Sequence, residues 1–100
     1  MKTLIFRLDG VTYECGAEPP NFDGKVVRRF TYGQEPKVIA ELGLVDGAAL
    51  EIHGYAEHWT NDEVCVVWTD DNFQHCSCWV QAAKVRRPPE DDWHGNYVAR

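Results

Sequence analysis

No lysine or arginine occurs between Lys37 and Lys84, a stretch that covers almost half of the 100-residue chain. The same stretch contains eight acidic residues, which are Glu41, Asp46, Glu51, Glu57, Asp62, Glu63, Asp70 and Asp71. A long run of one sign of charge repels phosphate groups and attracts cationic surfaces. Together with the formal net charge of −6, it argues against direct binding to nucleic acids or anionic membranes and predicts a protein partner with a basic surface.

Signatures of common enzymes and nucleotide-binding sites are missing as well. The chain contains no GxGxxG motif, no glycine-lysine loop that would cradle a phosphate, and no nucleophile elbow. Most of its four histidines lie among carboxylates, which favour the imidazolium form and make a poor metal ligand or base. We therefore expect no catalytic residue, no cofactor and a non-enzymatic function.

No long apolar segment marks a signal peptide or a membrane span. The apolar patch near the N-terminus is short and is interrupted by Arg7. The sequence thus predicts a cytoplasmic protein, and the reducing cytosol keeps thiols free.

Cysteine is scarce, and the chain has only Cys15, Cys65, Cys76 and Cys78. We expect these residues in the core, because free cysteine is among the most buried residue types. A disulfide and a zinc site stay open as alternatives. A symmetric turn at residues 71–72 would place Cys65 opposite Cys78 and bring the sulfurs of Cys65, Cys76 and Cys78 to one face. Zinc commonly takes four ligands from paired CxxC motifs, whereas this chain has one Cys-x-Cys.

A β-hairpin is predicted near the N-terminus. Apolar residues alternate with polar ones on both sides of Asp9-Gly10, a dipeptide typical of two-residue hairpin turns. The resulting cross-strand pairs are Leu8 with Val11, Phe6 with Tyr13 and Leu4 with Cys15. All six side chains then share one face, which predicts that Cys15 is buried.

The remaining pattern predicts a small β-dominated domain. Strands are expected near residues 25–32, 50–55, 64–68 and 75–80. A short helix is expected over residues 36–42, where Pro36 suits a first helical turn and Gly43 a C-terminal cap. The fold class is therefore α+β, with about six antiparallel strands as a small barrel or packed sheets. Residues 1–87 form one compact domain, and residues 88–100 form an extended or mobile tail.

Two segments resemble known families. The first comprises Pro36-Lys37-Val38-Ile39, Leu42-Gly43-Leu44, Gly47 and Leu50-Glu51-Ile52. Residues 36–52 thereby resemble the element that AbrB-type regulators and MazE-type antitoxins use to form dimers by exchanging hairpins. This resemblance implies an alternative function, a nucleic-acid-linked regulator whose basic patch would be Arg28, Arg29, Lys84, Arg86 and Arg87.

The second segment runs from Val64 to Val85, with an acidic turn in its middle. It is similar to the last strands of Src-homology-type small barrels, which are binding modules. The zinc alternative described above would make this chain a zinc-stabilised small-barrel binding module.

The preferred function is a non-catalytic, acidic protein-binding domain that engages a basic partner surface. Phage-encoded inhibitors of nucleic-acid-binding bacterial defence complexes, anti-CRISPR proteins among them, are small acidic domains of this kind. Trp59 and Phe73 are expected in loops beside acidic residues, where aromatic side chains often anchor a protein interface. The predicted binding residues are Glu57, Trp59, Asp62, Glu63, Asp70, Asp71 and Phe73.

Overall fold

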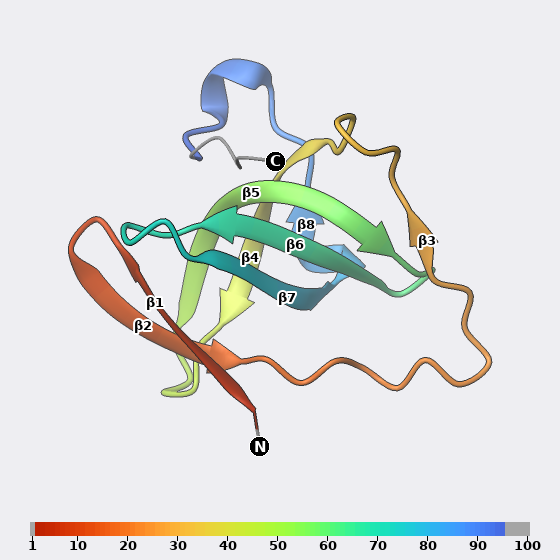
Figure 1. Cartoon of the computed structure of the whole chain (residues 1–100), viewed down its shortest axis with the longest axis horizontal. Coiled ribbons are helices and arrows are strands. Elements are labelled where there is room, and N and C mark those ends of the chain that lie inside the picture. Colours follow the sequence, from red (N-terminus) through yellow and green to blue (C-terminus); the bar gives the residue numbers. More distant parts are fainter. Residues whose placement is uncertain (1, 96–100) are drawn as a thin grey trace.

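Residues 2–95, which this computed structural model describes, are built almost entirely from antiparallel strands (Figure 1). The strands are β1 (Thr3–Leu8), β2 (Val11–Gly16), β3 (Arg28–Arg29), β4 (Lys37–Gly43), β5 (Ala49–Trp59), β6 (Glu63–Thr69), β7 (His75–Gln81) and β8 (Val85–Arg86). Two 3-10 turns, η1 (Ala82–Lys84) and η2 (Glu90–Asp92), are the helical elements of this part of the chain. The predicted β-dominated, antiparallel fold is confirmed.

The N-terminal hairpin has the predicted register. Leu8 pairs with Val11, Phe6 with Tyr13 and Leu4 with Cys15. Asp9 and Gly10 have positive φ values of 51° and 81°, as the two central residues of a hairpin turn with matching twist require. Most of the face that these pairs form packs into the core, where Cys15 is completely buried, whereas Val11 beside the turn remains exposed.

The other six strands form one curved sheet. The order of the main path is β7-β6-β5-β4-β8, and β3 pairs with the far end of β5 beyond β4. Only η1 separates β7 from β8 in the chain, yet the two strands lie at opposite ends of the order. The few residues of η1 can span only a short distance, so the sheet curls until its two edges approach each other. This curvature gives the predicted barrel-like shape.

The predicted helix over residues 36–42 is wrong, because this segment is the strand β4. All seven residues of β4 pair with β5, and two of them also pair with β8. Val38, Ala40 and Leu42 point into the core at a spacing of two, while Ile39 is buried on the other face. A strand covered on both faces carries consecutive apolar residues, which also mimic the spacing of a short helix.

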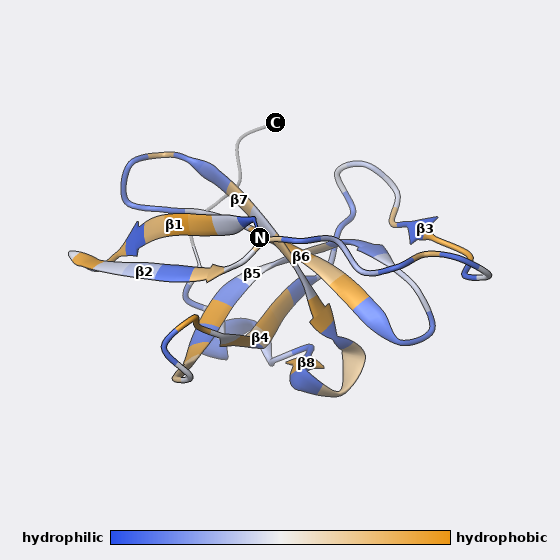
Figure 2. Ribbon diagram, turned by 90° about the horizontal axis from the view of Figure 1, so that it is seen from below, coloured by the Kyte–Doolittle hydropathy of each residue, from blue (hydrophilic) through white to orange (hydrophobic). Residues whose placement is uncertain are grey.

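The core lies between the hairpin and the curved sheet. Phe6 of β1 contacts the ring of Trp68 on β6 edge to face, with 5.2 Å between the ring centroids. Hydrophobic residues run along β1, β4 and β6, which supply much of this core (Figure 2). No helix among the described residues is long and apolar enough to cross a membrane.

Residues 88–95 return to the sheet. The indole Nε1 of Trp93 donates a hydrogen bond of 3.0 Å to the carbonyl oxygen of Gly54, and its ring lies 5.2 Å from that of Tyr55. Lys37 Nζ sits 4.8 Å from the centroid of the Trp93 ring. The remainder of the predicted tail, residues 96–100, lies outside the described residues.

Candidate functional site

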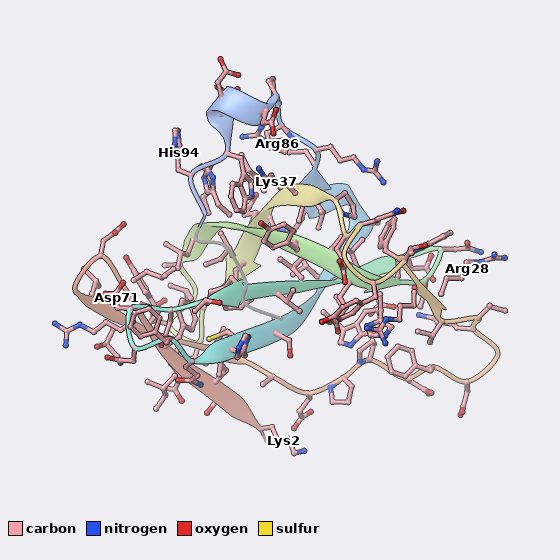
Figure 3. All side chains as sticks on the ribbon, turned by 45° about the horizontal axis from the view of Figure 1, so that its top comes forward. Lys2, Arg28, Lys37, Asp71, Arg86 and His94 are labelled. Carbon is pink, nitrogen blue, oxygen red and sulfur yellow. The ribbon has the colours of Figure 1, made fainter. Side chains whose placement is uncertain are left out.

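The predicted binding residues lie at opposite ends of β6. Glu57, Trp59, Asp62 and Glu63 surround the turn between β5 and β6, whereas Asp70, Asp71 and Phe73 belong to the turn between β6 and β7. The seven residues of β6 separate the two groups by roughly 20 Å at about 3.3 Å per residue. Figure 3 shows Asp71 at one end of the molecule and Arg28, which lies over Trp59, at the other. The structure therefore separates the predicted binding residues into two groups rather than one acidic patch.

Asp70 is a buried structural carboxylate with only 2% of its surface exposed. Its Oδ1 accepts hydrogen bonds of 2.9 Å from the N–H groups of Asn72 and Gln74, and its Oδ2 accepts one of 3.2 Å from the N–H of Arg7. Burial opposes ionisation, but the three backbone donors outweigh it and hold the pKa of Asp70 below its ordinary value. This side chain organises the β6–β7 turn and joins it to β1.

Asp71 binds the backbone of the turn in the N-terminal hairpin through its carboxylate. Its Oδ1 accepts a hydrogen bond of 3.1 Å from the N–H of Asp9, and its Oδ2 accepts one of 2.9 Å from the N–H of Gly10. Its own N–H donates to the carbonyl oxygen of Arg7 at 2.8 Å. Asp71 remains exposed, so its carboxylate also contributes charge to the surface.

Phe73 projects from this braced turn into solvent. Its side chain is 85% exposed, and its backbone has a φ of 60°, which is uncommon for a bulky residue. The N–H of Phe73 donates to the carbonyl oxygen of Asp70 at 3.0 Å. An exposed aromatic ring on a strained, tightly held turn is costly to the isolated domain and suits a contact with another molecule.

The acidic residues at the other end of β6 are partly neutralised within the chain. Lys25 Nζ lies 2.8 Å from Glu63 Oε1 and 3.5 Å from Asp62 Oδ2. The hydrogen bond with Glu63 is the main reason why the pKa of Lys25 is raised. Glu57 Oε1 lies 3.2 Å from the Nδ1 of His58. This end is thus less acidic than its sequence indicates.

A cleft of about 440 Å³ opens beside Trp59. Its apolar lining includes Phe30, Val38, Ala56, Trp59, Val64 and Val85, and two arginines, Arg86 and Arg87, also line it. We refer to it as the arginine–aromatic cleft. Sequence reasoning identified Trp59 but missed Phe30 and the apolar floor, because the lining residues come from four separate segments.

The five basic residues of the alternative function lie in different surroundings. Lys84 Nζ lies 3.5 Å from Glu41, and an Arg86 nitrogen lies 3.8 Å from Glu51. Arg28, Arg29 and Arg87 form no ion pair within residues 2–95. Arg28 lies over the ring of Trp59, and Arg87 lies over the ring of Phe30.

The predicted alignment of three sulfurs on one face is wrong. Thr69 pairs with His75, which leaves an odd number of residues in the turn and places Cys78 opposite Val66 and Cys65 opposite Trp79. Cys65 therefore faces away from the side that Cys76 and Cys78 share. Among residues 2–95 no group of three or more histidine, cysteine or acidic side chains is arranged to hold a metal ion.

All four thiols are free in the structure, and those of Cys15, Cys65 and Cys76 are buried, as their predicted core role requires. Cys15 and Cys78 interact with each other across the interface of the hairpin and β7. A hydrogen bond between their side chains raises the pKa of Cys15 and lowers that of Cys78. The Sγ of Cys78 also lies 3.4 Å from the carbonyl oxygen of Gly16.

Comparisons with protein-family models, with curated proteins and with solved structures found no match to this chain.

Proposed function

We propose that this chain is a non-catalytic protein-binding domain that engages a basic partner surface through the β6–β7 turn. The main support for the proposal is Phe73, whose side chain is 85% exposed and whose backbone has a φ of 60°. Its turn is fixed by the carboxylates of Asp70 and Asp71. An exposed aromatic side chain on a backbone that is already fixed is the usual kind of interface anchor, because binding need not order the turn.

The charge around Phe73 supports a basic partner. The hydrogen bonds of Asp70 and Asp71 bring the β6–β7 turn against Arg7, Asp9 and Gly10. Carboxylates outnumber guanidinium groups at this end of the domain, and Asp9 and Asp71 are exposed. A cationic partner would gain both association rate and specificity from this arrangement.

Inhibition of a nucleic-acid-binding host defence complex, in the manner of phage-encoded anti-CRISPR proteins, is the form of this function that we favour. The size, acidity and β-rich fold of the chain support it. In such a role, the carboxylates beside Phe73 would occupy a surface where the partner otherwise holds phosphate groups.

A capture experiment with matched variants tests the proposal. The tagged domain is used to retain proteins from a bacterial lysate at low and at raised salt, and the retained proteins are identified by mass spectrometry. Phe73→Ala is expected to weaken binding of the specific partner by about 2 kcal/mol or more, roughly 30-fold in Kd. Asp9→Asn removes one charge at a positive φ that asparagine tolerates well, and it should weaken binding mainly at low salt.

The control is Val26→Ala, because Val26 is another exposed apolar residue, at 68%. This variant should retain the partner like the unaltered chain. Equal retention of the same protein by the Phe73→Ala variant would refute the proposed role of the turn.

A further inference from the structure

The arginine–aromatic cleft is built like a binding site, and it is separate from the Phe73 turn. Its floor is aliphatic, with Val38 and Ala56 from the buried faces of β4 and β5, and with Val64 and Val85 beside them. Its volume of about 440 Å³ falls within the usual range for ligand pockets. An apolar group that moved from water into this cleft would give up no hydrogen bond.

Aromatic and cationic side chains form the walls of the cleft. The rings of Phe30 and Trp59 lie 6.2 Å apart at an angle of 38°. The guanidinium carbon of Arg87 lies 5.8 Å from the centroid of the Phe30 ring, and that of Arg28 lies 5.4 Å from the centroid of the Trp59 ring. Arg28 is directly opposite Trp59 in the pairing of β3 with β5, so it braces the ring.

The guanidinium group of Arg87 is available to bind an anion. It forms no ion pair within the described residues, and its guanidinium carbon lies over the ring of Phe30. A guanidinium group that stacks on a ring keeps the N–H donors at its edge, and these match the two oxygens of a carboxylate. Arg86, whose nearest carboxylate is 3.8 Å away, adds a second positive charge to the same wall.

We infer that the arginine–aromatic cleft binds an acidic peptide segment of a partner protein, with an apolar side chain in the cleft and a neighbouring carboxylate on Arg87. This site is independent of the proposed function of the Phe73 turn, because it lies at the other end of β6. The chain would thus have one site for a basic surface and another for an acidic segment.

The lining of the cleft favours a peptide over a nucleic acid. A nucleobase carries several polar atoms, and the aliphatic floor would leave some of them without partners. The hydroxyl group of Thr60, which is buried, already accepts hydrogen bonds from the N–H groups of Asp62 and Glu63. A phosphate backbone that extended beyond the two arginines would also meet Glu41 and Glu51, which line a neighbouring hollow that shares Val85 and Arg86 with the cleft.

Fluorescence anisotropy with a labelled peptide tests the inference. The probe is a short peptide in which one phenylalanine and one neighbouring glutamate lie between neutral residues, and it should bind in a saturable manner. Arg87→Gln should weaken binding about tenfold or more, the factor expected when one charge-assisted hydrogen bond is lost. Ala82→Phe should abolish binding. Ala82 lines the cleft with an exposed side chain, and the larger phenylalanine ring would fill the cleft.

Two matched controls accompany these variants. Arg29→Gln makes the same change of charge on the opposite side of β3 from Arg28, and it should bind the probe like the unaltered chain. Phe73→Ala should also bind normally, which separates this site from the proposed function. Thermal melting of every variant establishes that the fold is retained.

Three results would overturn the inference. They are absence of saturable binding by the unaltered chain, equal binding by the Arg87→Gln variant, and tighter binding of an oligothymidylate than of the peptide. The position of the ligand is checked by NMR titration, in which the indole N–H signal of Trp59 should shift on addition of the peptide. The signal of Trp68, whose side chain is buried in the core, should stay in place.

Discussion

The carboxylate of Asp71 accepts a hydrogen bond of 2.9 Å from the backbone N–H of Gly10, across 61 positions of the chain. With the second hydrogen bond from Asp9, this contact fastens the N-terminal hairpin to the sheet. Asp70 and Asp71, which the sequence placed among the predicted binding residues, therefore also belong to the framework of the domain.

Asp71→Ala is expected to destabilise the fold. The substitution leaves the N–H groups of Asp9 and Gly10 to water and removes two charge-assisted hydrogen bonds, so the free energy of unfolding should fall by about 1–3 kcal/mol. Urea unfolding followed by circular dichroism measures the change. Asp23→Ala, at another exposed loop acid, should change the free energy of unfolding by less than about 0.5 kcal/mol. Equal effects of the two substitutions would contradict the role of Asp71.

Asp70 is expected to make stability depend on pH in the acidic range. Its pKa is lower in the folded chain than in the unfolded chain, so its contribution is complete above the ordinary aspartate pKa of about 4. The contribution is lost as the pH falls from there through the folded pKa, because the unfolded chain then binds more protons. Urea midpoints at several pH values should show a shallower acid decline for Asp70→Asn than for the unaltered chain. Parallel declines would exclude this assignment.

The four thiols should differ in reactivity. Cys78 has a lowered pKa and is partly exposed, whereas hydrogen bonding to Cys78 raises the pKa of Cys15. Burial raises the pKa of Cys65 to about 12 and that of Cys76 to about 11. Since the thiolate is the nucleophile, iodoacetamide should label Cys78 first. Peptide mass spectrometry at successive times identifies the order, and labelling of Cys65 or Cys76 at the rate of Cys78 would refute the prediction.

Trp93 should contribute to stability although it lies in the predicted tail. Trp93→Phe keeps the ring against Tyr55 but loses the hydrogen bond to Gly54, which should cost about 1 kcal/mol. Trp93→Ala also loses the ring and its contact with Lys37, and it should cost about 2–3 kcal/mol. Chemical unfolding of both variants measures the two steps. An unchanged free energy of unfolding in the alanine variant would show that this segment does not stabilise the sheet.

Local signals in the sequence predicted the parts of the fold that local interactions determine. The Asp9-Gly10 turn and the alternation around it were sufficient to give the register of the first hairpin correctly. In β4 the local signals were misleading, because its neighbours in space, β5 and β8, decide its conformation. The alignment of the cysteines failed for a related reason, since it depends on the length of a turn that composition does not specify.

The candidate sites depend even more on distant contacts. The exposure of Phe73 could be anticipated from its place in an acidic turn, but the structural roles of the Asp70 and Asp71 carboxylates could not. The hydrogen bonds that join both carboxylates to the hairpin have donors more than 60 positions away. The arginine–aromatic cleft likewise exists only after Phe30, Trp59 and Arg87 have been brought together. Charge counted along the chain therefore overstated the acidity of one end, where Arg86 and Arg87 of the alternative basic patch line the cleft.

The attachment of the hairpin to the β6–β7 turn also has a consequence for the order of folding. A hairpin with a two-residue turn closes in about 1–10 μs, but on its own it is at best marginally stable in water. The groups that hold the β1–β2 hairpin, the carboxylates of Asp70 and Asp71, arrive only when a later segment has formed its own turn. The hairpin precedes the sheet in the chain, yet it is thus among the last elements to dock, and until then its apolar face remains open to chaperones and proteases.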